Sequence, residues 1–223
     1  NCEFDIDGCK QFLRADNAVT DGAKVEFVDS VVKVCGATEN AAFFDGTSKT
    51  GDISFTRSLV EISDSYRGLV QLGRVYLDAS TLVLTNISDM AVRTCSNCEL
   101  VNGAKIVLDT VGSHGFTACK LVVNAGCTVD VNNVAYLGIN VIDGSVFKAG
   151  SIVRAANCCI SDTGNYVNQD IAIRADSGGI KLHDVVLDLD HGVVISILAA
   201  IVDKEMCFII FVLCFANTAN ITE

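Results

Sequence analysis

The sequence contains no proline, no tryptophan and few aromatic residues. At the usual frequency of about 5%, a chain of this length would hold about 11 prolines. Proline removes a hydrogen-bond donor from the sheet ladder and is therefore kept out of strand interiors. Its absence favours a chain built from many strands. Because only 7% of the residues are aromatic, we expect a narrow core of Val, Ile, Leu and Ala.

The sequence also lacks clusters of basic residues. Its formal net charge is −11 and its pI is about 4.6. Nucleic-acid binding requires a basic patch, so this class of function is disfavoured. Half of the residues are hydrophobic, and 223 residues suffice for one all-β domain with a continuous core.

No apolar stretch is long enough for a membrane-spanning helix, which needs about 20 residues. The most apolar segment, residues 193–216, is interrupted by Asp203, Lys204 and Glu205. We therefore expect two buried strands joined by a charged turn in this segment, and no membrane span.

From Gly68 onward, short apolar runs alternate with small turn residues. The runs Thr81–Ile87 and Lys105–Val111 are typical, and Gly, Asn, Asp or Ser separate such runs. In places apolar and polar residues alternate, which is the period of a strand with one buried face. Short strands joined by tight corners predict a single-stranded parallel β-helix, or β-solenoid, most regular over residues 122–156.

A β-sandwich or jelly roll is the alternative fold. Asp143-Gly144 could close a two-residue hairpin, and hairpins belong to antiparallel sheets. Internal repetition is weak, since only Gly22-Ala23-Lys24-Val25 and Gly103-Ala104-Lys105-Ile106 echo one another. No fixed period runs through the chain, which excludes a regular hexapeptide or nonapeptide solenoid.

The pattern divides the chain into three parts. Residues 1–67 are more charged and less rhythmic, and a short helix is conceivable over residues 10–17. We expect this part to be an irregular cap or attachment segment, with residues 1–20 covering the open end of the solenoid. Residues 68–202 would form the solenoid body, and residues 203–223 an apolar cap or interface strand.

In its strand rhythm and its Gly and Asn corners, such as Asn124-Ala125-Gly126, the chain broadly resembles right-handed parallel β-helix proteins. This group includes pectate-lyase-like enzymes and phage tailspikes and appendages. The resemblance covers residues 68–202 and implies a fold. It includes no signature motif, so no functional residue carries over.

The densest polar cluster lies between His183 and His191. Asp184, Asp188 and Asp190 differ by even numbers, so in a strand they share one face. Carboxylates two residues apart suit calcium, or an acid and base around a glycosidic bond. The simpler interpretation is a solvated acidic face. We expect this face to be exposed and catalytically silent, with calcium as the only cofactor it could bind.

Other motifs are incomplete. Asp5-Ile6-Asp7-Gly8 resembles half a calcium loop but lacks the remaining ligands. Cys95 and Cys98 form a lone CxxC motif without the second ligand pair that zinc needs. Residues 112–115, which include Ser113 and His114, are expected to form a flexible loop, and no catalytic residue is predicted.

The eleven cysteines are scattered along the chain and odd in number. A secreted disulfide framework would be shorter and denser in cysteine. Cys119, Cys127 and Cys158 lie within apolar alternation, where a cysteine acts as a small buried hydrophobe. We expect these three to be buried and most of the eleven to be unpaired, with Cys2 and Cys9 as the best candidate for a disulfide.

These observations favour a non-enzymatic structural or adhesive subunit of a virion appendage or extracellular assembly. Its partners would be copies of itself or other subunits, and surface carbohydrate is a candidate ligand. Two alternatives remain open: a carbohydrate-active β-helix enzyme that uses the Asp184, Asp188 and Asp190 face, and a cytoplasmic polymerising scaffold with reduced cysteines.

The apolar C-terminal segment generates a first prediction. Residues 193–202 and 206–216 are too apolar to face water, and an uncovered apolar edge invites pairing with another chain. Truncation after Asp203 is expected to weaken oligomerisation more than it lowers strand content. Sedimentation and circular dichroism measure the two effects. A full-length chain that sediments as a monomer at micromolar concentration, with the truncated chain no different, would contradict this expectation.

Overall fold

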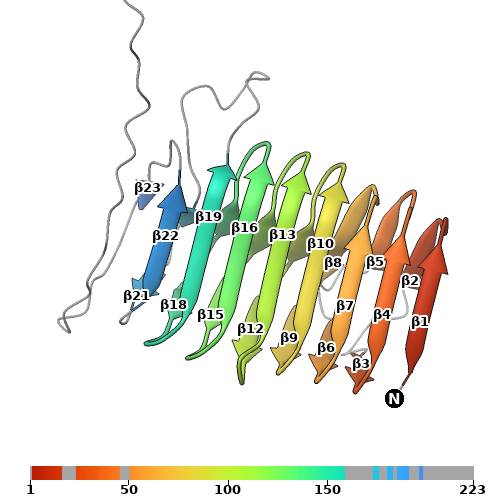
Figure 1. Ribbon diagram of the computed structural model, residues 1–223, viewed down its shortest axis with the longest axis horizontal. Helices are drawn as coiled ribbons and strands as arrows, with labels where there is room; N and C mark the ends of the chain where they lie inside the picture. The colour runs from red at the N-terminus through yellow and green to blue at the C-terminus, as the bar shows by residue number, and fades with distance from the viewer. Residues whose placement is uncertain are drawn as a thin grey trace, which may run out of the picture.

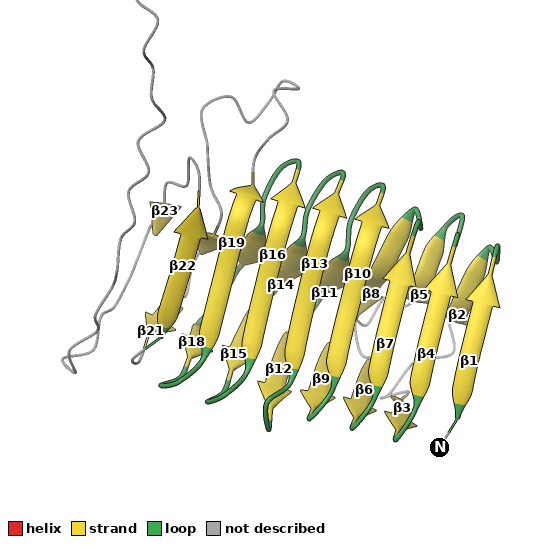
Figure 2. Cartoon of the chain, in the orientation of Figure 1, coloured by secondary structure: helices red, strands yellow, loops and turns green. Residues whose placement is uncertain are grey.

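The computed structural model describes residues 2–16, 24–45, 51–158, 173–175, 180–182, 185–190 and 196–197. All secondary-structure elements within these residues are β-strands. The strands form three parallel sheets that extend side by side along one axis, so that each coil contributes one strand to each sheet (Figures 1 and 2). This confirms the predicted β-solenoid. The sandwich alternative is wrong, because the strands pair in parallel.

We name the sheets A, B and C in the order in which the chain visits them. Sheet A contains β1 (Glu3–Asp7), β4 (Val31–Cys35), β7 (Leu59–Ser63), β10 (Thr81–Ile87), β13 (Lys105–Val111), β16 (Thr128–Val134), β19 (Ile152–Cys158) and β22 (Val186–Asp190). Sheet B contains β2 (Gln11–Asp16), β5 (Asn40–Asp45), β8 (Arg67–Leu72), β11 (Val92–Thr94), β14 (Phe116–Ala118), β17 (Ile139–Val141), β20 (Ile173–Ala175) and β23 (Ser196–Ile197). Sheet C contains β3 (Lys24–Val28), β6 (Asp52–Thr56), β9 (Arg74–Asp78), β12 (Asn97–Val101), β15 (Lys120–Val123), β18 (Ser145–Phe147) and β21 (Ile180–Leu182).

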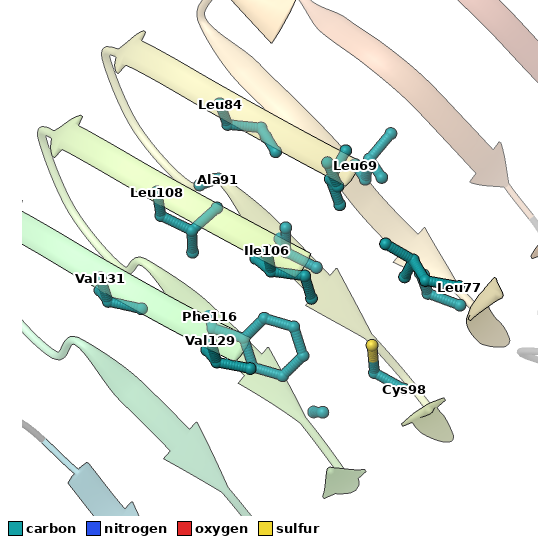
Figure 3. Packing of buried hydrophobic residues seen from close by; sticks show 14 of the residues in the cluster. Leu69, Leu77, Leu84, Ala91, Cys98, Ile106, Leu108, Phe116, Val129 and Val131 are labelled. Atoms are coloured by element: carbon teal, nitrogen blue, oxygen red, sulfur yellow. The ribbon is translucent and has the colours of Figure 1, made fainter. Parts of the chain in front are cut away.

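The core is a set of aliphatic columns inside the three sheets. Alternate residues of each strand point inward, and the same position recurs one coil further along. Leu84, Leu108 and Val131 are in register on β10, β13 and β16, and all are buried (Figure 3). A void near Phe12 and Phe55 measures only about 10 Å³, no more than about one water molecule. This part of the core is therefore filled by side chains.

The described residues before Gly68 have the same architecture as those after it. Strands β1 to β7 lie in the same three sheets as the strands after Gly68. The helix considered over residues 10–17 is wrong where the structure describes it, because Gln11–Asp16 is β2 and pairs with β5. Phe12 and Leu13 of this strand pack against the core, and sheet pairing overrides the local helix pattern.

The coils differ in length, which explains why no fixed period appears in the sequence. Ser30 and Ser58 lie one coil apart and are separated by 28 residues, whereas Ser58 and Ser80 are separated by 22. The echo at Lys24 and Lys105 is not a structural repeat, since β3 belongs to sheet C and β13 to sheet A. Asp143-Gly144 turns the corner from β17 of sheet B to β18 of sheet C and makes no hairpin.

At the corner from sheet C to sheet A, serine hydroxyls satisfy buried backbone groups. The Ser30 N–H donates to Ser58 Oγ at 3.1 Å, and the Ser58 N–H donates to Ser80 Oγ at 2.9 Å. Each hydroxyl in turn donates to a carbonyl two residues earlier, as Ser80 does to Asp78 O at 2.8 Å. A buried backbone group without a partner is costly, so small hydroxyl residues suit this corner.

At the corner from sheet A to sheet B, successive coils repeat one left-handed residue. Asp64, Asn86, Thr110, Asn133 and Asn157 all have φ between 48° and 56°. Asn side chains form a ladder here: Asn86 Nδ2 donates to Asp64 Oδ1 at 3.1 Å, and Asn157 Nδ2 to Asn133 Oδ1 at 3.2 Å. Asn and Asp tolerate this conformation. Thr110 is the exception, because β-branched residues are strained at positive φ.

Thr110 therefore generates a stability prediction. Thr110→Asn is expected to raise the thermal midpoint, because it removes about 1–2 kcal/mol of left-handed strain and places an amide next to Asn86. Thermal unfolding followed by circular dichroism is the measurement. The matched control is Asn133→Thr at the equivalent position one coil further along, which should lower the midpoint. A Thr110→Asn midpoint at or below that of the wild type would contradict the strain argument.

Candidate functional site

A groove runs along β6 on the outer face of sheet C. The outward residues Ser54 and Thr56 are short, whereas the strands on both sides carry long side chains in the rows of Asp52 and Ser54. Glu26 of β3 and Tyr76 of β9 lie in register with Ser54. This difference in side-chain length leaves a depression of about 420 Å³.

Charges of both signs surround the groove. Lys24, Asp52 and Arg74 form one cross-strand row, and Glu26 and Glu99 also line the depression. In-register neighbours on adjacent strands are close enough to interact directly. The walls can therefore donate hydrogen bonds from Lys and Arg and accept them at carboxylates, while Ser54 and Thr56 provide hydroxyls.

Contacts with Glu99 and Tyr76 hold Arg74 in place at one wall of the groove. Its Nη2 donates to Glu99 Oε2 at 3.1 Å, and its guanidinium lies 5.0 Å from the centroid of the Tyr76 ring. The Nε atom of Arg74 is buried and has no hydrogen-bond partner. Stacking on an aromatic face and pairing with a carboxylate both favour a fixed guanidinium plane.

Tyr76 is the aromatic residue of the groove. Partial burial raises the pKa of its phenol above the usual value near 10, and the nearby carboxylates of Asp78 and Glu99 add to this, while Arg74 opposes it. The phenol therefore stays protonated at neutral pH and can both donate and accept a hydrogen bond.

A second depression of about 380 Å³ lies across the corner from sheet C to sheet A. Asp29 and Arg57 line it and form a bidentate pair, with Arg57 Nε 2.6 Å from Asp29 Oδ1 and Nη2 2.8 Å from Oδ2. This hydrogen bonding lowers the pKa of Asp29. Because both groups are solvent-exposed, the pair contributes little to stability.

The predicted acidic face is only partly within the described residues. Asp188 and Asp190 lie in β22, in register with Arg154 and Ala156 of β19, and Asp184 lies outside the described residues, as do His183 and His191. Across the described part of the chain, no group of three or more His, Cys, Asp or Glu side chains is arranged to hold a metal ion. The acidic face stays a prediction.

The cysteine motif is structural where it is described. Cys98 points into the core from β12 (Figure 3), and burial raises the pKa of its thiol. Cys127 and Cys158 are buried as predicted, but Cys119 is only partly buried. Cys119 stands at the corner between β14 and β15, where the alternation of inward and outward residues is interrupted. Cys2 and Cys9 carry free thiols, so no disulfide joins them.

Residues 112–115, expected to be a flexible loop, form a corner of the solenoid. Ser113 Oγ lies 2.8 Å from His114 Nδ1, and the His114 ring lies 6.0 Å from that of Tyr136. Burial lowers the pKa of His114, which the nearby Asp89 partly offsets. The imidazole is therefore neutral at pH 7, where it packs as part of the corner.

Sequence reasoning did not identify the groove. Its residues come from β3, β6, β9 and β12, and the coil lengths that bring them together vary. One signal was present in the sequence: the outward residues of Asp52–Thr56 are short, and those of the preceding and following strand segments are longer. Only the register of the sheet shows that these side chains lie next to one another.

Comparison with protein-family models, with curated proteins and with solved structures gives no match for this chain. In the described residues, no helix has the length and apolar character needed to cross a membrane. The groove is therefore interpreted from its own geometry.

The environment of Tyr76 can be tested by ultraviolet titration. Glu99→Gln is expected to lower the Tyr76 pKa towards that of a free tyrosine, because it removes a nearby negative charge and frees Arg74 from its partner. Subtracting the titration of Tyr76→Phe isolates this phenol. Asp109→Asn, on sheet A, is the control and should leave the value unchanged. An unchanged pKa in Glu99→Gln would show that Glu99 does not act on Tyr76.

Proposed function

We propose that this chain is a non-enzymatic structural or adhesive subunit of a virion appendage or extracellular assembly, and that the groove along β6 contacts surface carbohydrate. The observation that carries the proposal is the groove: a floor of hydroxyls between walls of both charges, with a tyrosine at its edge. Polyhydroxylated ligands present many hydrogen-bond donors and acceptors, and such walls match both kinds.

The rigidity of the platform supports this function. Strands on both sides of β6 pair with it along their full length, and Ile53 and Phe55 of the same strand are buried in the core. A site on packed strands keeps its geometry better than one on loops. Less conformational freedom is then lost when a ligand binds.

The first coil supports the assembly part of the proposal. Among the described residues, β1, β2 and β3 each pair on one side only. The Phe4 ring lies 6.0 Å from Phe12 and 5.9 Å from Phe27, so aromatic side chains gather in the first coil. Unpaired strand edges are templates for strands of other chains.

Binding to a glycan array tests the adhesive role. Ser54→Lys would place a long charged side chain on the groove floor and is expected to weaken binding at least about tenfold, or ~1.4 kcal/mol. The matched control is Thr85→Lys, an outward position on β10 of sheet A, which should bind like the wild type. The carbohydrate contact is wrong if the wild type binds no glycan or if Ser54→Lys binds equally well.

Two further measurements test the non-enzymatic role and the assembly role. Shortening of a bound glycan would establish the carbohydrate-active enzyme instead of a non-enzymatic subunit. Electron microscopy of the native material is expected to show a particle or filament lattice. Dispersed monomers at micromolar concentration would overturn the assembly role.

A further inference from the structure

The corner between β12 and β13 contains the only Asn-Gly dipeptide in the sequence, Asn102-Gly103. Both residues are exposed and both have positive φ, 54° and 76°. A Cβ added to Gly103 would meet no atom within 4 Å, so this face of the corner is open.

We propose that Asn102 is a site of spontaneous deamidation, and that the neighbouring Asp78 restrains it. The backbone nitrogen of Gly103 attacks the side-chain carbonyl carbon of Asn102. The bond from that carbon to Nδ2 breaks, the amide leaves as ammonia, and a cyclic succinimide forms. Water then opens the ring and leaves either aspartate or isoaspartate. Water is the only co-reactant, and no oxidation or reduction occurs.

The residue after the asparagine decides how readily this attack takes place. A side chain on that residue shields its own backbone nitrogen and limits the rotations that bring the nitrogen to the carbonyl carbon. Glycine has no side chain and the widest backbone freedom. Other left-handed asparagines of the solenoid are followed by bulky buried residues: Asn86 by Ile87 and Asn133 by Val134.

Asp78 opposes the reaction in the folded chain. Asn102 Nδ2 donates to Asp78 Oδ1 at 2.7 Å, which holds the amide in one orientation and must break before the side chain can rotate. The rate is therefore set by how often this corner opens.

The product changes the corner next to the groove. Deamidation replaces an amide donor with a carboxylate, and the hydrogen bond to Asp78 becomes a contact between two negative charges. Asp78 ends the strand that carries Tyr76, and Asn102 follows the strand that carries Glu99. The corner that follows the Tyr76 and Glu99 strands therefore gains negative charge as the protein ages, and an isoaspartate would also lengthen the backbone at this corner.

The test compares Asn102 with Asn133 in the same full-length molecule. Asn133 is a close internal control: its φ is 53°, and its Nδ2 donates to Asp109 Oδ1 at the same distance of 2.7 Å, but valine follows it. The protein is kept in ¹⁸O-labelled water at mildly alkaline pH and body temperature, and peptide mass spectrometry follows both sites. Asn102 is expected to convert at least about tenfold faster than Asn133. Equal rates at the two sites would overturn the proposal.

Two variants separate the roles of glycine and aspartate. Asp78→Ala should accelerate conversion several-fold, because the amide loses its acceptor, and slower conversion would show that Asp78 assists the reaction instead. Gly103→Ala should slow conversion. Circular dichroism checks that both variants remain folded, and the wild-type comparison with Asn133 decides the proposal without any substitution.

Discussion

The whole structure depends on one constraint: residues of the strands stack in register on their counterparts one coil away. Parallel pairing brings equivalent positions to the strand spacing of about 4.8 Å. Inward positions then form continuous apolar columns such as Leu84, Leu108 and Val131. Outward positions form equally continuous surface columns. A change at one position is therefore felt first by the residues directly above and below it.

The corners show what this constraint demands of the backbone. At each corner the chain must leave one sheet without leaving buried polar groups unpaired. The same solution recurs from coil to coil. Serine hydroxyls satisfy the backbone at one corner, and left-handed Asn or Asp residues form a side-chain ladder at another. Thr110 occupies a ladder position although it is β-branched and has a positive φ. Backbone strain is therefore located at this residue in an otherwise regular corner.

The same stacking creates the groove. A flat sheet has no cleft of its own, so relief on its outer face comes from the lengths of stacked side chains. Ser54 and Thr56 are short, and Glu26 and Tyr76 beside them are long. Arg74, fixed between Glu99 and Tyr76, makes one wall rigid. The chemistry of the outer face is thus set by which outward side chains stack on one another. The core contributes by holding the strands in place.

The sequence by itself determined the class of fold, because strand alternation and the absence of proline are local properties of the chain. It also indicated that Cys127 and Cys158 act as core residues, whereas Cys119, expected in the same class, is only partly buried. Tertiary structure decided the rest. Sheet pairing made β2 a strand against its local helix pattern, and unequal coil lengths hid which residues stack. The groove joins residues from four coils, so the short outward residues of Asp52–Thr56 do not by themselves show which side chains lie beside them. Only the register, which long-range pairing sets, brings Glu26, Ser54, Tyr76 and Glu99 together.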